Sequence, residues 1–325
     1  MKLLCLLLPF WFPIKPTGTI ESVRPTKAFF FSEPYTIYKN KEEKYIVHSD
    51  ICPHQGASLS TGKITKDDFH LQCPYHGFEF ENGKFCKIPN PSDPCVKKFD
   101  SKRQHLPLLE SKLEQDFLFV RTKLKNRTLD ESVFFPPEEY NSSFRGVSGT
   151  VRIPTNFMLI CENLLDMLHI SYVHQFGSTQ TPLPHTTNFT WLSPIHGQST
   201  FFYSPSNTTI SRQVGKVKEV KVENEFHMPT NTVTRVFAGS TIKTVFTRTI
   251  PISENESILY WKIYRNFWLF PLGDFLIRYL MNQTVKEDIS ILKRVYPNHR
   301  NGSISTKFDK TIHEFRKLYK KYHIF

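Results

Sequence analysis

Two cysteines and two histidines stand at spacings typical of metal ligands held in loops. The sequence reads Cys52-Pro53-His54 and, after eighteen further residues, Cys73-Pro74-Tyr75-His76. Zinc accepts two Cys and two His, but zinc-finger spacing pairs Cys with Cys and His with His. Here each half supplies one Cys and one His, which suits a 2Fe-2S cluster with two Cys on one iron and two His on the other. The pattern predicts this cluster, with a zinc site as the alternative.

Small and cyclic residues beside the ligands allow two loop tips to close over a cluster, because they add little side-chain bulk. They are Pro53, Gly56, Pro74 and Gly77. With these residues the stretch resembles the Rieske family. Rieske proteins of the cytochrome complexes carry an extra Cys in each ligand loop, and neither Gln55-Gly56 nor Tyr75 supplies one here. The resemblance is therefore to the oxygenase and ferredoxin branch, and it implies a lower potential and a role as an electron relay.

A second group of polar residues lies in an apolar stretch. Residues 156–168 contain no Pro or Gly and predict a helix, on which Asn163, Asp166 and His169 follow at steps of three. Their side chains are then expected on one stripe of a mostly apolar helix. A core helix tolerates such a stripe where the polar groups find partners or a metal. By themselves, His169 and His174 could also be hydrogen-bonded core histidines.

The spacing D-x-x-H-x-x-x-x-H, from Asp166 to His174, resembles the mononuclear iron motif of the Rieske non-heme iron oxygenases. The resemblance implies that His169 and His174 bind Fe(II). It also implies that Asp166 links His169 to the cluster ligand His76 of a neighbouring subunit. Asn163 matches a position that lines the iron pocket in some members. Iron of this kind takes a carboxylate as its third ligand and leaves positions open for dioxygen.

The third ligand is expected near the C-terminus. Residues 283–292 show a helical pattern with apolar residues at 285, 289 and 292, which places Asp288 beside the apolar face and Glu287 toward the side. The family's third ligand is an Asp in a similar acidic or amide pair on a C-terminal helix. We therefore assign Asp288, with Glu287 as the alternative.

Length and composition set the broad class. The chain has 325 residues, which predicts about two domains. Its net charge is +12, but Lys and Arg are dispersed and not interleaved with aromatics, so nucleic acid is not the expected partner. An acidic redox protein and plain compositional bias both account for the charge. Six Cys without a disulfide pattern favour a reducing compartment, predicted as the cytoplasm, with an organelle or a membrane periphery as alternatives.

Membrane-like segments are short. No apolar run approaches the roughly 18 residues of a span. Residues 3–12 resemble a short signal sequence, but no small-residue cleavage site follows and Pro9 and Pro13 interrupt the run. We interpret 10–14 as the first turn and strand of the cluster domain, with a membrane anchor as the alternative. The apolar segment 267–277 is interrupted by Pro and Gly and could wall a substrate channel.

The scaffold is predicted to be α+β. Short runs rich in Phe, Tyr, Ile and Val between 28 and 120 predict antiparallel strands, and Asn82-Gly83 predicts a hairpin between two of them. We expect a Rieske 2Fe-2S domain over 1–125, a linker over 126–149, and a mononuclear iron domain over 150–325. The last contains the ligand helix and a sheet over 185–265, in a helix-grip-like arrangement.

The family resemblance covers nearly the whole chain and implies a terminal oxygenase component, similar to single-subunit demethylases and pheophorbide a oxygenase-like members. Electrons from NAD(P)H would arrive through a ferredoxin or flavin reductase, and a head-to-tail homotrimer would join the cluster of one chain to the iron of the next. The aromatic-rich second domain predicts a hydrophobic, ring-bearing substrate. The alternative is an electron carrier without oxygenase activity.

Overall fold

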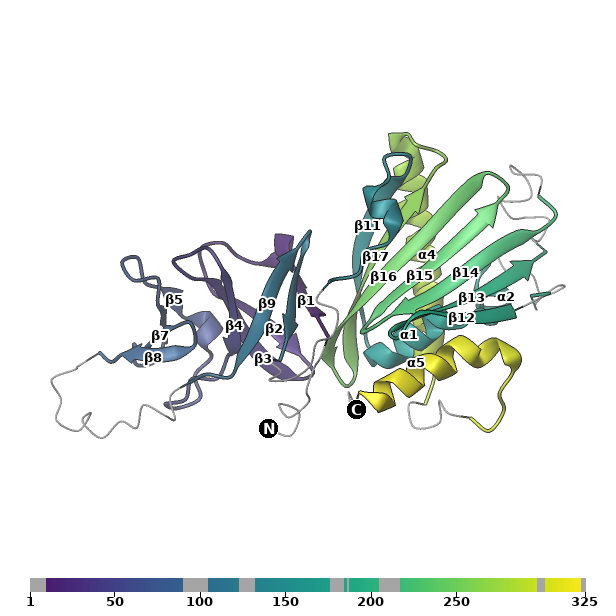
Figure 1. The fold of residues 1–325 in the computed structure, drawn as a ribbon. Helices are drawn as coiled ribbons and strands as arrows, with labels where there is room; N and C mark the ends of the chain where they lie inside the picture. The colour runs from purple at the N-terminus through teal and green to yellow at the C-terminus, as the bar shows by residue number, and fades with distance from the viewer. Residues whose placement is uncertain are drawn as a thin grey trace. The chain divides into compact units, whose positions relative to one another are not determined.

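A computed structural model describes residues 10–89, 105–122, 132–175, 184–185, 187–204, 217–296 and 302–322. Residues 3–9 of the apolar N-terminal run therefore lie outside the described part. The chain divides into two compact units, Met1–Val133 with Pro251–Ser253, and Phe134–Ile250 with Glu254–Phe325 (Figure 1). Each unit is built on antiparallel sheets, and the helices that cover a sheet belong to the second unit. The predicted α+β class is confirmed.

The first unit contains two sheets. The larger has the strand order β1-β10-β9-β4-β3-β2 and the smaller β5-β6-β7-β8. The strands are β1 Phe12–Pro16, β2 Thr26–Phe30, β3 Glu33–Lys39, β4 Tyr45–Ser49, β5 Lys63–Ile64, β6 Leu71–Gln72, β7 Glu79–Glu81, β8 Lys84–Lys87, β9 Leu108–Glu114 and β10 Phe117–Arg121. The centre of the larger sheet is buried on both faces, since Ile37 and Val47 and their strand neighbours Thr36 and His48 are all fully buried. The interpretation of 10–14 as turn and strand agrees with β1.

Turn chemistry sets the strand ends in this unit. Asn82 and Gly83 both have positive φ, 47° and 76°, as a two-residue turn between β7 and β8 requires. The predicted hairpin is confirmed. Phe31 and Ser32 also have positive φ, so the run of three Phe ends β2 and turns into β3.

The described residues of the second unit form a seven-stranded sheet and four α-helices. The strand order is β11-β17-β16-β15-β14-β13-β12. The strands are β11 Arg145–Ile153, β12 Thr187–Ser193, β13 His196–Tyr203, β14 Val220–His227, β15 Asn231–Ala238, β16 Thr241–Ser253 and β17 Glu256–Arg265. The helices are α1 Phe157–Leu165, α2 Ile170–Val173, α4 Pro271–Leu292 and α5 Lys310–Lys321 (Figure 1).

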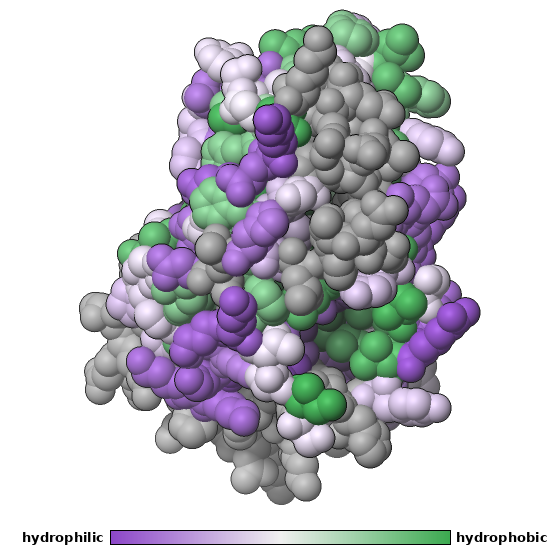
Figure 2. Space-filling model, turned by 90° about the vertical axis from the view of Figure 1, so that its right-hand side faces the viewer, coloured by the Kyte–Doolittle hydropathy of each residue, from purple (hydrophilic) through white to green (hydrophobic). Residues whose placement is uncertain are grey.

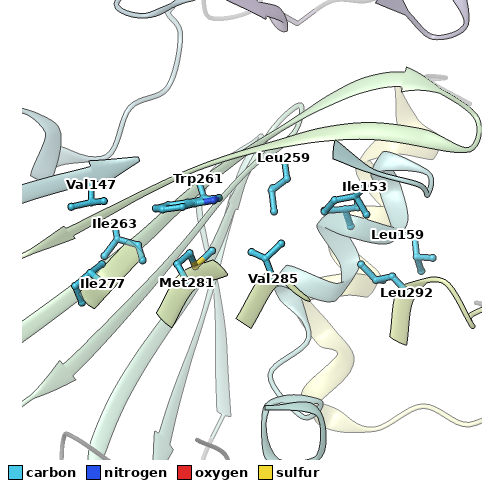
Figure 3. Packing of buried hydrophobic residues seen from close by; sticks show 11 residues of the cluster. Val147, Ile153, Leu159, Leu259, Trp261, Ile263, Ile277, Met281, Val285 and Leu292 are labelled. Atoms are coloured by element: carbon cyan, nitrogen blue, oxygen red, sulfur yellow. The ribbon is translucent and has the colours of Figure 1, made fainter. Parts of the chain in front are cut away.

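The core of the second unit lies between α4 and the β11–β17 end of the sheet. Ile277, Met281 and Val285 follow at steps of four on α4 and pack against Trp261 and Leu259 of β17 (Figure 3). The side chains at these positions are 7% exposed or less. Removing such apolar area from water stabilises the fold by about 25 cal/mol per Å². This packing fixes how α4 is rotated about its axis.

Most of the described part of the expected linker 126–149, residues 134–149, belongs to the second unit. A 3-10 turn, Pro137–Tyr140, is held by Glu138, which pairs with Arg235 of β15, and β11 already begins at Arg145. Gly149 lies in this strand because the Trp261 ring occupies the space of a side chain there. The Pro, Gly and Ser content of the segment therefore reflects close packing in the second unit.

One further expectation needs correction. The helix predicted over 156–168 ends at Leu165, so Asp166 and His169 do not continue a stripe on it with Asn163. The Asp166 carboxylate accepts a hydrogen bond from the Leu168 backbone N–H at 2.8 Å, and a side chain that bonds its own backbone in this way competes with the helix. In addition, the segment 267–277 contains a helix start, because Pro271 occupies the first turn of α4, where a missing N–H costs nothing.

We predict that Gly149→Ala destabilises the protein by about 1–3 kcal/mol, because the new Cβ would lie 2.5 Å from a Trp261 ring carbon in a packed core. Thermal and denaturant unfolding of the full chain would measure this. Gly146→Ala in the same strand is the matched control, since its Cβ meets the flexible end of Lys262 at 3.0 Å. Equal unfolding curves for the two variants would contradict the packing argument.

Candidate metal sites

The two cluster loops have the same backbone hydrogen-bond pattern. In the first, the Cys52 N–H donates to Ala57 O at 2.9 Å and the Gly56 N–H donates to Cys52 O at 2.9 Å. In the second, the Cys73 N–H donates to Phe78 O and the Gly77 N–H donates to Cys73 O, at 2.8 and 3.1 Å. Each Gly stands four residues after its Cys with φ near +70°, a conformation that favours glycine.

The side chains of these loops separate by type. Cys52 and Cys73 are buried, and burial raises the pKa of the Cys52 thiol. His54 is exposed and His76 half-buried, and their Nδ1 atoms lie 3.2 Å apart. Two buried thiols behind two adjacent outer imidazoles fit a cluster that takes sulfur ligands on one iron and nitrogen ligands on the other.

Asp50 anchors the first loop from within. Its carboxylate is buried and accepts hydrogen bonds from Thr36 Oγ1, Ser58 Oγ and the Ser60 backbone N–H, each at 2.6 Å. Burial alone would raise the pKa of Asp50, but these donors outweigh it and the pKa is lowered. The residue therefore remains a carboxylate at neutral pH and holds the Cys52 loop against β3.

Three ligand-type side chains meet in the second unit. The ligand atoms of His169, His174 and Asp288 all lie within 4.8 Å of one another. Nε2 of His169 and Nε2 of His174 are 3.2 Å apart, and each is 3.4 Å from Oδ1 of Asp288. The histidines flank the short helix α2, and Asp288 lies on the buried stripe of α4, three residues after Val285. Packing of α4 against the sheet therefore brings the carboxylate to the histidines.

Neighbouring polar groups orient these three residues. Asn163 Nδ2 of α1 donates to Asp288 Oδ1 at 3.1 Å, and Glu287 Oε2 lies 2.9 Å from His174 Nδ1. Glu287 thus holds the far nitrogen of His174 while Nε2 points to the other ligands, a common arrangement around metal-binding histidines. Glu287, the alternative third ligand, contacts the opposite side of the imidazole from Asp288.

The charges at this site are suited to a cation. Burial lowers the pKa of His169, but Asp288 and Asp166 outweigh it, so the net shift is upward. For His174 burial dominates over the nearby carboxylates and the pKa is lowered. A metal must displace any proton on these nitrogens, so its affinity falls as the pH is lowered. Two imidazoles and a carboxylate with converging ligand atoms form the two-His, one-carboxylate set that non-heme Fe(II) uses.

Asp166 lies where α1 ends and is partly exposed. Its Oδ2 is 3.9 Å from His169 Nδ1, beyond hydrogen-bond distance. Among the described residues His169 Nδ1 is buried without a hydrogen-bond partner. An orphaned buried ring nitrogen carries a desolvation cost, which a small movement of the Asp166 carboxylate would relieve.

Other described histidines have contacts outside the two candidate sites. His196 Nε2 lies 3.0 Å from Glu225, His227 Nδ1 lies 2.9 Å from the Met228 carbonyl, and His185 Nε2 lies 2.9 Å from Ser204. His70 pairs with the buried Glu79, and with Asp68 the two form another set of ligand atoms within 4.8 Å. Because Glu79 is also held by Gln72 and Lys87, an ion-pair network accounts for that set.

Several supporting residues were missed from the sequence. Arg316 of α5 forms a two-pronged ion pair with the buried Glu162 of α1, at 2.8 and 2.7 Å. Asn224 of β14 donates to the Leu164 carbonyl at 3.1 Å where α1 ends. Helical and strand periodicity gave no signal for either pair, since their partners are distant in the sequence.

We predict that Glu287→Gln weakens divalent metal binding at His169, His174 and Asp288 by about 10–100-fold, because the amide orients the His174 ring less strongly. Titration of metal-depleted protein with Fe(II) or Co(II) would measure this. Lys286→Gln is the matched control, as Lys286 is exposed on the same turn of α4. Unchanged affinity in Glu287→Gln would show that the contact has no orienting role.

Two family models match the chain. Residues 10–100 match the model of the Rieske [2Fe-2S] domain, and residues 153–323 match that of the vanillate O-demethylase oxygenase C-terminal domain. The chain is 24% identical to the protochlorophyllide-dependent translocon component 52 of Arabidopsis thaliana, over 96% of the chain and 65% of the relative. It is 29% identical to the dicamba O-demethylase oxygenase component of Stenotrophomonas maltophilia, over 47% of the chain and 44% of the relative.

The matched part thus covers less than two thirds of either relative's own length. Among solved structures, dicamba monooxygenase bound to dicamba has the same fold. Its TM-score is 0.76 at 18% sequence identity, and the match covers 97% of each chain.

Proposed function

Because the chain belongs to the Rieske non-heme iron oxygenases, we propose that it is an oxygenase component that hydroxylates or oxidatively demethylates a hydrophobic ring-bearing substrate. The observation that carries this proposal is the convergence of His169, His174 and Asp288 within 4.8 Å. An electron carrier without oxygenase activity would need no such set. The two histidines and carboxylate therefore favour the oxygenase over the electron carrier.

The residues divide between two metal groups. Cys52, His54, Cys73 and His76 would hold the 2Fe-2S cluster. His169, His174 and Asp288 would hold Fe(II). When bound, the cluster relays single electrons and the Fe(II) activates dioxygen. The chain positions these groups and controls access to them.

The protein environment of the iron ligands has two tasks. Asn163 donates to Asp288 Oδ1 and Glu287 contacts His174 Nδ1, so these contacts orient the ligand atoms toward one another. The turn between α1 and α2 is enclosed by apolar groups, and the Tyr203 hydroxyl donates to the Met167 carbonyl. Preorganised ligands next to an apolar enclosure limit the access of water to the reacting centre.

The substrate class is proposed from the aromatic-rich sequence of the second domain. A pocket lined by such residues suits a ring-bearing molecule with few charges. The cluster beside the turn, Met167, Phe201, Val220, Val222, Ala238 and Phe308, is packed core. We propose a tetrapyrrole, a sterol or a methoxylated aromatic as the classes to test.

The proposed partners follow from the family. Electrons from NAD(P)H would reach the cluster through a ferredoxin or flavin reductase, whose acidic surface the net charge of +12 would attract. We propose a head-to-tail homotrimer in which the half-exposed Asp166 lies at the subunit contact. The cytoplasm is the proposed compartment. No described helix has the length and apolar character to cross a bilayer.

The function is tested by substrate-dependent oxygen uptake with reconstituted reductant, across the three substrate classes. We expect coupled uptake and an oxygenated product with at least one class. Asp288→Ala should lose the mononuclear iron and all product while keeping the visible spectrum of the cluster, since the two ligand sets share no residue. Strong coupling only to a small charged aliphatic compound would contradict the substrate class. No product from any class with iron fully loaded would favour the electron carrier.

Asp166→Asn tests the proposed subunit contact. The amide keeps the shape but removes the charge that favours an imidazole partner. We expect both metals and cluster reduction to be retained, whereas the product yield of a single turnover from pre-reduced protein falls at least tenfold. Metal content and sedimentation of both forms are the controls. Native yield in the variant, or a fully active monomer, would rule out this role.

A further inference from the structure

The outward face of the first half of α4 carries large apolar side chains in contact with solvent. Their spacing of three and four residues places them on one stripe, continued by the two residues before the helix. We call this stripe the α4 patch. It comprises Leu269, Phe270, Leu272, Phe275, Leu276, Tyr279 and Leu280, which are between 37% and 65% exposed. Figure 2 shows hydrophobic side chains gathered at the top of the view, where Figure 1 places the start of α4.

Core packing does not account for the patch. The opposite stripe of α4, with Ile277 and Met281, already supplies the contacts to the sheet. Farther along the helix the exposed residues are mostly polar, with Asn282, Lys286 and Ser290, and Ile291 is a single exposed apolar side chain among them. The contiguous apolar stripe therefore lies in the first three turns. Contiguous apolar surface of more than a few hundred Å² on a protein marks an interaction site, whereas single exposed residues need no explanation.

The charges of α4 indicate what kind of surface the patch fits. All three acids of the helix are engaged by other groups. Asp274 pairs with Arg145 and Arg265, at 2.7 and 2.5 Å, Glu287 contacts His174, and Asp288 is buried.

The two bases of α4, Arg278 and Lys286, are exposed, although Arg278 also donates a hydrogen bond from Nη1 to the Ser148 carbonyl at 2.6 Å. The helix thus presents apolar and aromatic side chains with cations beside them and no unpaired acid. This composition is typical of helices that lie in the interface of an anionic membrane.

We propose that the α4 patch docks on the surface of a lipid bilayer that contains anionic lipids. Phe275 and Tyr279 would lie at the headgroup level, and Arg278 and Lys286 would face the lipid phosphates. The contact is interfacial, because α4 continues into the core of the second unit. This inference is independent of the proposed oxygenase activity.

A second copy of the chain fits the patch less well. A head-to-tail contact, as in the proposed trimer, would bring Arg278 and Lys286 against another surface of a protein of net charge +12, and this charge repels them. An acidic protein partner would bind a surface on which cations predominate. The α4 patch instead consists of seven apolar or aromatic side chains. Charge and apolar area together favour the lipid surface.

The test is co-sedimentation of the full, metal-loaded chain with vesicles of phosphatidylcholine alone or mixed with phosphatidylserine. We expect binding to the mixed vesicles that weakens at high salt. The variant Leu272→Ser with Phe275→Ser should partition about 100-fold more weakly, at about tenfold for each half-buried large side chain. Leu108→Ser with Leu113→Ser is the matched control, since both residues are about half exposed on β9 of the first unit. That control should bind as the native chain does.

Three outcomes would overturn the proposal. Native protein could stay in the supernatant with both vesicle types. The Leu272→Ser, Phe275→Ser variant could bind as the native chain does. Sedimentation velocity could show that the native chain is an assembly and the variant a monomer, while neither binds vesicles. That result would assign the patch to a second copy. Circular dichroism checks folding, and the single variant Tyr279→Ser gives a milder test of the same surface.

Discussion

The packing of α4 against the sheet is the interaction on which the candidate iron site depends. Ile277, Met281 and Val285 fill the space beside Trp261, and this sets which side of the helix faces inward. Asp288 continues the same stripe, so a carboxylate enters the buried layer beside α1. Burying an ionised group is costly unless it is paired, and Asn163 and the two histidines supply the pairing. Hydrophobic contact over most of the helix thus offsets the cost of one buried polar set.

The two candidate sites are built by different means. The cluster loops depend on backbone geometry, because each turn is closed by hydrogen bonds to its own Cys and by a glycine with positive φ. The iron ligands depend on tertiary packing, because α2 and α4 must meet before their side chains converge. Local sequence therefore specifies the first site far more directly than the second.

This difference explains how much could be predicted from sequence. The Cys and His of the cluster and the Asn82-Gly83 hairpin could be predicted because spacing and turn chemistry are local signals. Asp288 was assigned from the family resemblance together with helical periodicity and stays a prediction, and the contact of Glu287 with His174 Nδ1 favours it over Glu287. The predicted end of the helix at residue 168 was wrong because the Asp166 side chain accepts a hydrogen bond from the Leu168 backbone N–H. Hydrophobic periodicity carries no information on such a side-chain contact. Asp50, Asn224 and Arg316 carried no signal, since their importance arises from partners distant along the chain.

The matching hydrogen bonds of the two cluster loops separate loop shape from metal ligation. The backbone groups of Cys52 and Cys73, and the two glycines, close the turns without using a thiol or an imidazole. Loops closed by backbone hydrogen bonds keep their shape when a ligand side chain is replaced. The ligand residues can therefore change while the loop backbone stays the same. Evolution of the reduction potential in such a domain therefore needs no rebuilding of the loops, since exchange of a ligand or of a residue beside it is sufficient.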